Sequence, residues 1–424
     1  MFSLAKCNLV GVGVNVVEIA HLASDLNCGT SVLPFRFLGL PVGGSTHRSG
    51  NWSAVIDKFT RKLSRWKART LSIGGRITLC KSVLDSLGTY FFSLYKAPTK
   101  ILKRLESIRS FFFWGSNAEG KRSIAWVKWK QVLNKHEQGG LGLGSLHAQN
   151  LALLTKWWWR FQTSSTGTWR EVITALYGGG GDGSLGCQLR SVMRGTVMGK
   201  ITRLKEDIIE LGIDIDDLMY KCTTIGNQTG DTWQWGLGGQ LEFTTSSLRK
   251  VIDDMILVSK GLPCWWSRLV PRKVNVFVWR VSLGGLPTRV NLEKRGCPLQ
   301  SSMCPLCNRA EESEFHLFFD CCTAKELQAH LLSWWENRSF PVGASHFISL
   351  LDQNALRCSA KAETTRRAYC WVLWNYRNDN IFNGKTKGNT QLVSKVKSMS
   401  FKWFCNRGKK YDRCTWENWC QSIV

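Results

Sequence analysis

The chain has 424 residues, 43% of them hydrophobic, which is enough for about two to four domains with apolar cores and excludes a largely disordered protein. Its 57 lysines and arginines exceed its 31 acidic residues and give a net charge of +26, which favours a polyanion as partner, either nucleic acid or an anionic membrane surface. The alternative is a solvated basic surface, and nucleic acid is the preferred interpretation. No apolar run reaches the roughly 18 residues that cross a bilayer. Sixteen cysteines without a disulfide-scaffold rhythm indicate reduced thiols in the nucleus or cytoplasm.

Residues 1–50 are predicted to form short strands. LVGVGVNVVEIA, residues 9–20, alternates glycine with valine, and this pattern favours a strand over a signal peptide. LPFRFLGLPVGG, residues 33–44, is punctuated by prolines and paired glycines, which are typical of tight turns between strands.

A strongly basic helix is predicted over residues 51–70, NWSAVIDKFTRKLSRWKART. Apolar residues recur at three- and four-residue steps from Trp52 to Trp66, and Asn51 is a suitable N-cap. Lysines and arginines occupy the opposite face. The next stretch, LSIGGRITLCKSVLDSL, is expected to break at Gly74 and Gly75 and to resume as a helix.

Further helices are predicted at residues 98–115, 150–162 and 168–178. In the first, Pro98 is a typical start and Gly115 a typical stop. GGGGDG, residues 178–183, indicates a flexible boundary and not a phosphate cradle, because no Gly-Lys-Ser/Thr follows it. Residues 184–240 are weakly patterned, and residues 272–296 predict two helices across a tight break.

The stretch CPLCNRAEESEFHLFFDC, residues 304–321, has the spacing of a metal site. Cys304 and Cys307 form a C-x2-C pair that lets one turn direct two thiolates at one ion. His316 and Cys321 complete a Cys3His set, which prefers zinc and leaves no open position for catalysis, so the zinc is predicted to be structural. The alternative is four unrelated side chains in a cysteine-rich chain, and Cys297 and Cys322 are reserve ligands.

Several of these motifs resemble one family in the family's own order. LPFRFLGLPVGG, WKARTLSIGGRITLCKSVLDSL, FFFWG and GGLGLGSLHAQNLALLTKWWWRF resemble the region after the polymerase palm in plant LINE-type (non-LTR) retrotransposon reverse transcriptases. KVNVFVWRVSLGGLPTRVNLEKRG and the cysteine stretch resemble the zinc-binding domain at the end of those proteins, and WVLWNYRNDNIFNGK resembles their C-terminal stretch. The resemblance implies RNA-directed DNA polymerase as the family activity and the same four metal ligands.

The polymerase's paired aspartates are expected upstream of the LGLPVG motif, and the roughly thirty residues there do not contain them. Two-metal phosphoryl transfer needs several converging carboxylates. Asp216-Asp217 and Asp253-Asp254 lack that context and are interpreted as solvated or capping acids. No catalytic residue is therefore predicted, and this chain alone is expected to be inactive as an enzyme.

The basic helix follows the palm where a polymerase thumb would lie, and phosphate contact is one interpretation of its basic face. A solvated helix face is the equal alternative. The candidate nucleic-acid-binding residues are Lys58, Arg61, Lys62, Arg65, Lys67, Arg69, Arg76 and Lys81.

The predicted fold is mainly α with minor β: a helical, thumb-like post-palm region, a small zinc-binding module and a helical basic tail. The predicted regions are a palm remnant at 1–50, a thumb-like connector at 51–180, a linker at 181–240, the zinc-binding domain at 241–335 and a basic, Trp-rich region at 336–424. The predicted function is a zinc-containing, nucleic-acid-binding fragment of a retrotransposon polymerase that contacts RNA or DNA through the backbone and does not bind membranes. The alternatives are a reverse transcriptase part that needs a separately encoded palm, and a decayed element or zinc module for protein contacts.

Overall fold

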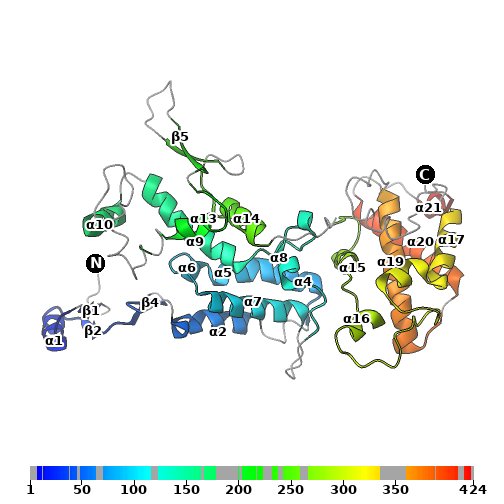
Figure 1. Ribbon diagram of the computed structural model, residues 1–424, viewed down its shortest axis with the longest axis horizontal. Coiled ribbons are helices and arrows are strands. Elements are labelled where there is room, and N and C mark those ends of the chain that lie inside the picture. The colour runs from blue at the N-terminus through cyan, green and yellow to red at the C-terminus, as the bar shows by residue number, and fades with distance from the viewer. Residues whose placement is uncertain are drawn as a thin grey trace. The chain divides into compact units, whose positions relative to one another are not determined.

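The computed structural model describes residues 7–11, 13–37, 39–44, 48–63, 70–115, 123–163, 167–177, 199, 203–215, 217–222, 232–236, 242–257, 266–334, 360–386, 388–408 and 415–421. These residues are mainly helical with three two-stranded sheets, which confirms the predicted fold class (Figure 1). The chain divides into two compact units. The first comprises Met1–Leu63, Ser82–Arg109 and Ser145–Met255, and the second comprises Ser64–Lys81, Ser110–Gly144 and Ile256–Val424. None of the described helices combines the length and apolarity that a membrane crossing requires.

The first unit starts with two small sheets. β1 (Asn8–Val10) pairs in parallel with β2 (Gly29–Ser31), and α1 (Val16–Asp25) connects them. β3 (Phe35–Phe37) and β4 (Leu40–Val42) form an antiparallel hairpin. The strand predicted over residues 9–20 is therefore wrong beyond Val10. Asn15 starts a helix there, because its side chain accepts a hydrogen bond from the Val17 amide at 3.1 Å and Glu18 lies in the first turn.

The predicted basic helix forms in part. A 3-10 turn, η2 (Ser49–Trp52), leads into α2 (Ser53–Lys62), while residues 64–69 lie outside the described part. Trp52, Val55 and Phe59 are buried on the inner face of α2. The Trp52 ring lies 5.9 Å and 6.2 Å from the rings of Phe91 and Phe92 in α6 (Thr89–Phe92), so these aromatic contacts hold α2 in the unit.

The core of the first unit is organised by α9 (Leu146–Thr163), which packs on α6 and α13 (Leu204–Ile209). The Asn150 side chain accepts from the Ala97 amide and donates to the carbonyls of Phe92 and Tyr95 at 2.8–2.9 Å. These three bonds fix the turn between α6 and α7 (Thr99–Trp114). The remaining elements are α5 (Asp85–Leu87), α10 (Thr168–Tyr177), the antiparallel pair β5 (Met219–Cys222) and β6 (Thr232–Trp235), and α14 (Thr245–Ile256).

Asp253 of α14 is buried, so of the two interpretations given to it the solvated acid is wrong and the capping acid agrees with its contacts. Its Oδ1 accepts from the Ser145 amide at 3.0 Å and from the Ser145 hydroxyl at 2.7 Å. Because Ser145 precedes α9, Asp253 satisfies backbone and side-chain donors at the start of that helix. Burial raises the pKa of the Asp253 carboxyl, and the two Ser145 hydrogen bonds oppose this shift.

The second unit contains short helices before the metal region. They are α4 (Ile73–Leu79), α8 (Trp129–Leu133) and the 3-10 turn η4 (His136–Gln138). The π-helix η3 (Cys80–Leu84) begins in this unit, which ends at Lys81. The break expected at Gly74 and Gly75 is wrong, because Ser72 caps α4 and its hydroxyl accepts from the Gly75 amide at 3.2 Å. Both glycines therefore lie in the first turn of α4.

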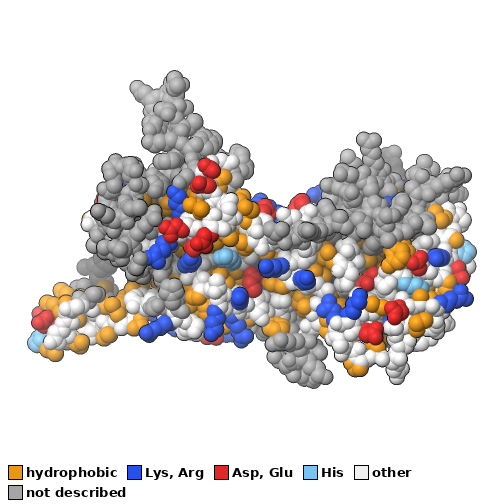
Figure 2. Space-filling view, in the orientation of Figure 1, with side chains coloured by type: hydrophobic (Ala, Val, Ile, Leu, Met, Phe, Trp, Pro, Cys, Tyr) orange, Lys and Arg blue, Asp and Glu red, His pale blue; other side chains and the backbone are white. Residues whose placement is uncertain are grey.

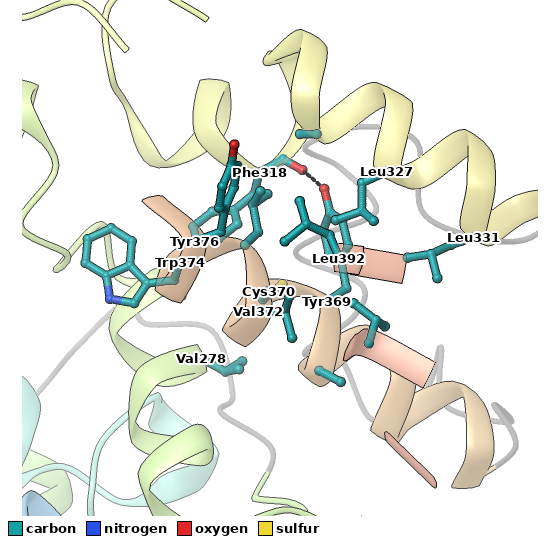
Figure 3. Close-up of a cluster of buried hydrophobic side chains, with 14 of the residues drawn as sticks. Val278, Phe318, Leu327, Leu331, Tyr369, Cys370, Val372, Trp374, Tyr376 and Leu392 are labelled. Atoms are coloured by element: carbon teal, nitrogen blue, oxygen red, sulfur yellow. Dashed lines mark hydrogen bonds between the residues drawn. The ribbon is translucent and has the colours of Figure 1, made fainter. Parts of the chain in front are cut away.

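The other helices of the second unit surround the metal region and share one hydrophobic core (Figure 3). They are α15 (Arg272–Ser282), the π-helix η5 (His316–Asp320), α17 (Cys322–Trp334), α19 (Ala360–Asn383), α20 (Asn389–Arg407) and α21 (Trp416–Gln421). α16 (Arg289–Glu293) belongs to the same unit but contributes no buried residue to this core. Figure 3 shows Val278 of α15, Phe318 of η5, Leu327 of α17 and Leu392 of α20 converging on α19. Residues on both sides of the boundary predicted at 335 thus contribute to the same core.

The role of Asp253 can be tested with a matched pair of substitutions. Asp253→Ala leaves buried Ser145 donors without an acceptor and should lower the free energy of unfolding by about 1–3 kcal/mol. Asp253→Asn keeps an acceptor oxygen and removes a charge that burial disfavours, so it should cost much less. Urea titration at neutral pH measures both. Equal losses for the two variants would contradict the assigned hydrogen bonds.

Candidate metal centre

The four predicted metal ligands lie together in the second unit. One ligand atom from each of Cys304, Cys307, His316 and Cys321 falls within 4.8 Å of all the others. The Cys304 and Cys321 sulfurs are 3.9 Å apart, and the Cys307 sulfur lies 3.2 Å from His316 Nε2. Cys304 and Cys321 are fully buried, whereas Cys307 and His316 are partly exposed.

A tight turn presents the first two ligands. Met303 and Glu311 form an isolated β-bridge, and the Cys304 amide donates to the Ala310 carbonyl at 2.7 Å. Asn308 follows Cys307 with φ of 54°, a left-handed conformation that asparagine adopts more readily than most residues. The chain therefore reverses directly after the C-x2-C pair, and both thiols point to the same side.

A π-helical turn presents the other two ligands. His316 begins η5, and its amide donates to the Ser313 hydroxyl at 3.0 Å. The Cys321 amide donates to the His316 carbonyl at 2.7 Å, which closes the turn from one ligand to the other. In this wide turn the Phe318 carbonyl accepts hydrogen bonds from two side chains. The donors are the Tyr369 hydroxyl at 2.6 Å, drawn in Figure 3, and Gln328 Nε2 at 2.9 Å.

The donor set fits a tetrahedral zinc ion. Zinc–sulfur bonds of about 2.3 Å and zinc–nitrogen bonds of about 2.0 Å place neighbouring sulfurs about 3.8 Å apart and sulfur and nitrogen about 3.5 Å apart. The separations of 3.9 Å and 3.2 Å need only small adjustments to reach these values. Four protein ligands fill the coordination sphere, so the ion they would hold stabilises the fold and does not activate substrate or water.

Cys304 and Cys321 lie close enough for each thiol to change the pKa of the other. The hydrogen bond with Cys321 lowers the pKa of the Cys304 thiol, and the same bond raises the pKa of Cys321. Burial lowers the pKa of the His316 imidazole, which favours the neutral form that binds metal. The Cys304 thiol therefore loses its proton more readily than the Cys321 thiol, and the His316 imidazole is favoured in its neutral form.

A buried ion pair fixes the cysteine turn to α19. Glu312 is fully buried, and its two carboxylate oxygens accept from Arg377 Nε and Nη2 at 2.5 Å and 2.6 Å. The Arg289 amide donates to the same carboxylate at 2.8 Å. Since Glu312 directly follows the β-bridge residue Glu311, this bidentate pair sets the position of the turn that carries Cys304 and Cys307.

Two arginines that precede the cysteine stretch contact residues 125–126 of the same unit. The guanidinium groups of Arg280 and Arg295 lie 5.6 Å and 4.9 Å from the Trp126 ring centre. Arg295 also donates to the carbonyls of Ala125 and Trp126 at 2.6 Å and 3.0 Å. These cation–π and hydrogen-bond contacts join residues 125–126 to the chain directly preceding the cysteines.

Sequence reasoning identified the four clustered side chains but missed their supports. Nothing in the local pattern around Glu312 indicates a partner 65 residues away. The available signal was Arg377 itself, a charged residue in the otherwise apolar WVLWNYR stretch of a helix, because a buried arginine usually has a partner. The reserve ligands Cys297 and Cys322 are not members of the cluster among the described residues.

The predicted nucleic-acid-binding residues have different environments. Lys58, Arg61 and Lys62 are exposed on α2 in the first unit. Arg65, Lys67 and Arg69 lie outside the described residues. Arg76 and Lys81, in the second unit, are half-buried: Arg76 donates to the Phe113 carbonyl at 2.9 Å, and the Lys81 ammonium lies beside Gly142.

Metal content tests the ligand set. Protein refolded with zinc should contain about one zinc per chain, and Cys307→Ser should abolish its tight retention because one thiolate is lost. The matched control is Cys322→Ser, which changes a neighbouring half-buried thiol outside the cluster and should keep the zinc. Elemental analysis after gel filtration measures the zinc content of both variants and of the wild-type protein. Metal-free wild-type protein would refute the site.

The ion pair between Glu312 and Arg377 leads to a prediction about stability and zinc affinity. Arg377→Met leaves Glu312 buried without its partner and should destabilise the second unit by about 3–5 kcal/mol. Zinc affinity should fall about 10- to 100-fold, as for other residues that support metal ligands. Exposed Arg407→Met is the matched control. Competition with a chromogenic chelator measures affinity, and the double variant Glu312→Leu/Arg377→Met should recover part of the loss. Unchanged affinity in Arg377→Met would contradict this role.

Comparisons with known proteins agree with this geometry. Residues 243–327 match the protein family described as zinc-binding in reverse transcriptase. An Arabidopsis thaliana protein provisionally named a ribonuclease H protein is 24% identical over 418 residues, covering 82% of this chain and 67% of the relative. An uncharacterized mitochondrial protein of Arabidopsis thaliana is 38% identical over 72 residues, which cover 17% of this chain and 46% of that protein. The chain is therefore related to plant retrotransposon reverse transcriptases and carries a zinc-binding domain of that class.

Proposed function

We propose that this chain is a zinc-containing, nucleic-acid-binding part of a LINE-type, non-LTR retrotransposon polymerase, and that its own residues bind RNA or DNA without catalysing nucleotide transfer. The observation that carries the proposal is the Cys3His cluster inside a domain matched to reverse transcriptases. A closed four-ligand site suits a structural ion, so the zinc would hold the second unit together. Binding would then depend on the surface side chains of the helices.

Charge and exposure support nucleic acid as the partner. The chain has a net charge of +26, and α2 separates its two faces clearly. Val55 and Phe59 are buried, whereas Lys58, Arg61 and Lys62 are exposed. Figure 2 shows Lys and Arg side chains gathered over the part of the first unit where Figure 1 places α2. Such a face suits the phosphate backbone, which gives affinity without sequence preference.

The acidic residues support binding over catalysis. Asp253 accepts two hydrogen bonds from Ser145 and is thus engaged in packing. Asp217 is exposed, and Asp216 lies outside the described residues. Two-metal phosphoryl transfer needs carboxylates that share one site. The proposed role of this chain is therefore to hold nucleic acid in the nucleus or the cytoplasm, where retrotransposon RNA and DNA occur.

One observation favours the alternative in which a separately encoded palm completes the enzyme. β1 and β2 form a parallel pair of three residues each, which is too small to be stable alone. The connecting helix exposes Val16 and Val17 at 68% and 64% of their surface. A further sheet packed on this face would bury these side chains and extend the strand pair. Nucleotide incorporation by a mixture of this chain and a palm, but by neither alone, would support this alternative.

Salt dependence tests the electrostatic role of α2. Wild-type, zinc-loaded protein should bind RNA with an affinity that falls steeply with salt concentration. Replacing Lys58, Arg61 and Lys62 by alanine should reduce the slope of log affinity against log salt by about 2 to 3, close to 0.9 per lost phosphate contact. The control replaces exposed Lys294, Lys325 and Lys385, which changes net charge equally. Equal effects of the two triple variants would contradict a specific role for α2.

A further inference from the structure

A groove lies between α17, α20 and α21 in the second unit, away from the four metal ligands in sequence. Its volume is about 630 Å³, within the roughly 300–1,000 Å³ of small-molecule sites. The lining residues that define its chemistry are His330 and Trp334 of α17, Thr390, Ser394 and Lys397 of α20, and Trp416 of α21. Two indole rings, an imidazole, an ammonium group and, with Ser333, three hydroxyls thus surround one open space.

The aromatic residues of the groove differ in their environment. Trp334 is buried, and its Nε1 donates to the Cys420 carbonyl at 3.0 Å, so it forms a fixed wall. Trp416 packs edge-on against Phe401, with ring centres 5.2 Å apart, and still exposes 42% of its surface. An indole exposed at the edge of a groove offers an apolar ring face to a planar ligand.

The charge of the groove selects among planar ligands. Lys397 Nζ lies 4.6 Å from the Trp334 ring centre, and this cation–π contact holds the ammonium beside the groove. Among the described lining residues, none is acidic. α20, which forms one wall, carries Lys395, Lys397, Lys402 and Arg407 and contains neither aspartate nor glutamate. An aromatic group that carries negative charge would complement this surface.

We propose that this groove binds one nucleotide of single-stranded RNA or DNA, with the base against Trp416 and a phosphate near Lys397. Ser394 and Thr390 can donate to the sugar or phosphate oxygens. Bases in a duplex are stacked and paired, so they cannot enter, whereas a single strand presents them freely. The inference rests on the proposed nucleic-acid binding and adds a second contact in the unit that contains the metal ligands.

The test measures binding of the full-length, zinc-loaded chain to a fluorescein-labelled 20-nucleotide oligouridine and to a labelled duplex of equal length. Trp416→Ala should weaken single-strand binding about tenfold, and Trp416→Phe should retain most of it because a ring face remains. Lys397→Ala should lower the salt slope by about 1. Lys395→Ala, on the same helix but not lining the groove, is the control. Duplex affinity should change little in the Trp416 variants.

The outcomes separate this inference from the proposed function. Suppose that the wild-type chain binds RNA and that Trp416→Ala, Trp416→Phe and Lys397→Ala bind single strands with the same affinity as wild type. This result would overturn the proposed nucleotide site in the groove and leave the proposed function unaffected. A wild-type chain that binds no nucleic acid would refute both. Zinc content and thermal unfolding are checked for each variant. If Trp416→Ala does not fold, two other measurements decide the question. One is the affinity of Lys397→Ala for single strands, and the other is the fluorescence quenching on binding, which should be larger in wild type than in Trp416→Phe.

Discussion

The buried pair between Glu312 and Arg377 is the constraint on which the metal region depends. A carboxylate that is fully removed from water is stable only with donors on both oxygens, and Arg377 and the Arg289 amide supply them. The pair joins α19 to the turn that carries Cys304 and Cys307. Tyr369, also on α19, donates to the Phe318 carbonyl between the other two ligands. Both halves of the metal site are therefore attached to one helix.

Because of this attachment, the core around the metal ligands includes residues beyond the segment that matches the zinc-binding family. The matched family region ends at residue 327, yet α19 begins at Ala360 and contributes both polar supports and core residues. Cys304 and Cys321 belong to the same core as Tyr369 and Leu373. The apolar side chains within residues 304–321, among them Leu317, Phe318 and Phe319, are buried in this same core together with side chains of α19. The core that contains Cys304 and Cys321 therefore extends from α15 to α21.

The sequence predicted what depends on local chemistry. The C-x2-C pair, a histidine and a cysteine at ligand spacing identified the side chains that converge, and apolar periodicity identified α7, α9 and α15. One interpretation stayed open because a distant residue decides it. Asp253 has its partner Ser145 108 residues away, so a local pattern could not distinguish burial from solvation. Residues 9–20 were misassigned because their β-branched content outweighed the Asn15 cap, a single side chain that starts α1.

The position of Cys321 also links the metal site to the groove. Cys321 immediately precedes α17, so a bound ion would fix the first turn of this helix through one thiolate. The other end of α17 supplies His330 and Trp334 to the groove wall. A helix transmits a displacement of one end to the other, since its backbone hydrogen bonds make it stiff over a few turns. Loss of a bound metal would therefore disturb Trp334, which contacts Lys397, even though no metal ligand lines the groove. If the chain binds zinc and nucleic acid as proposed, a structural ion would in this way affect nucleotide binding in the groove.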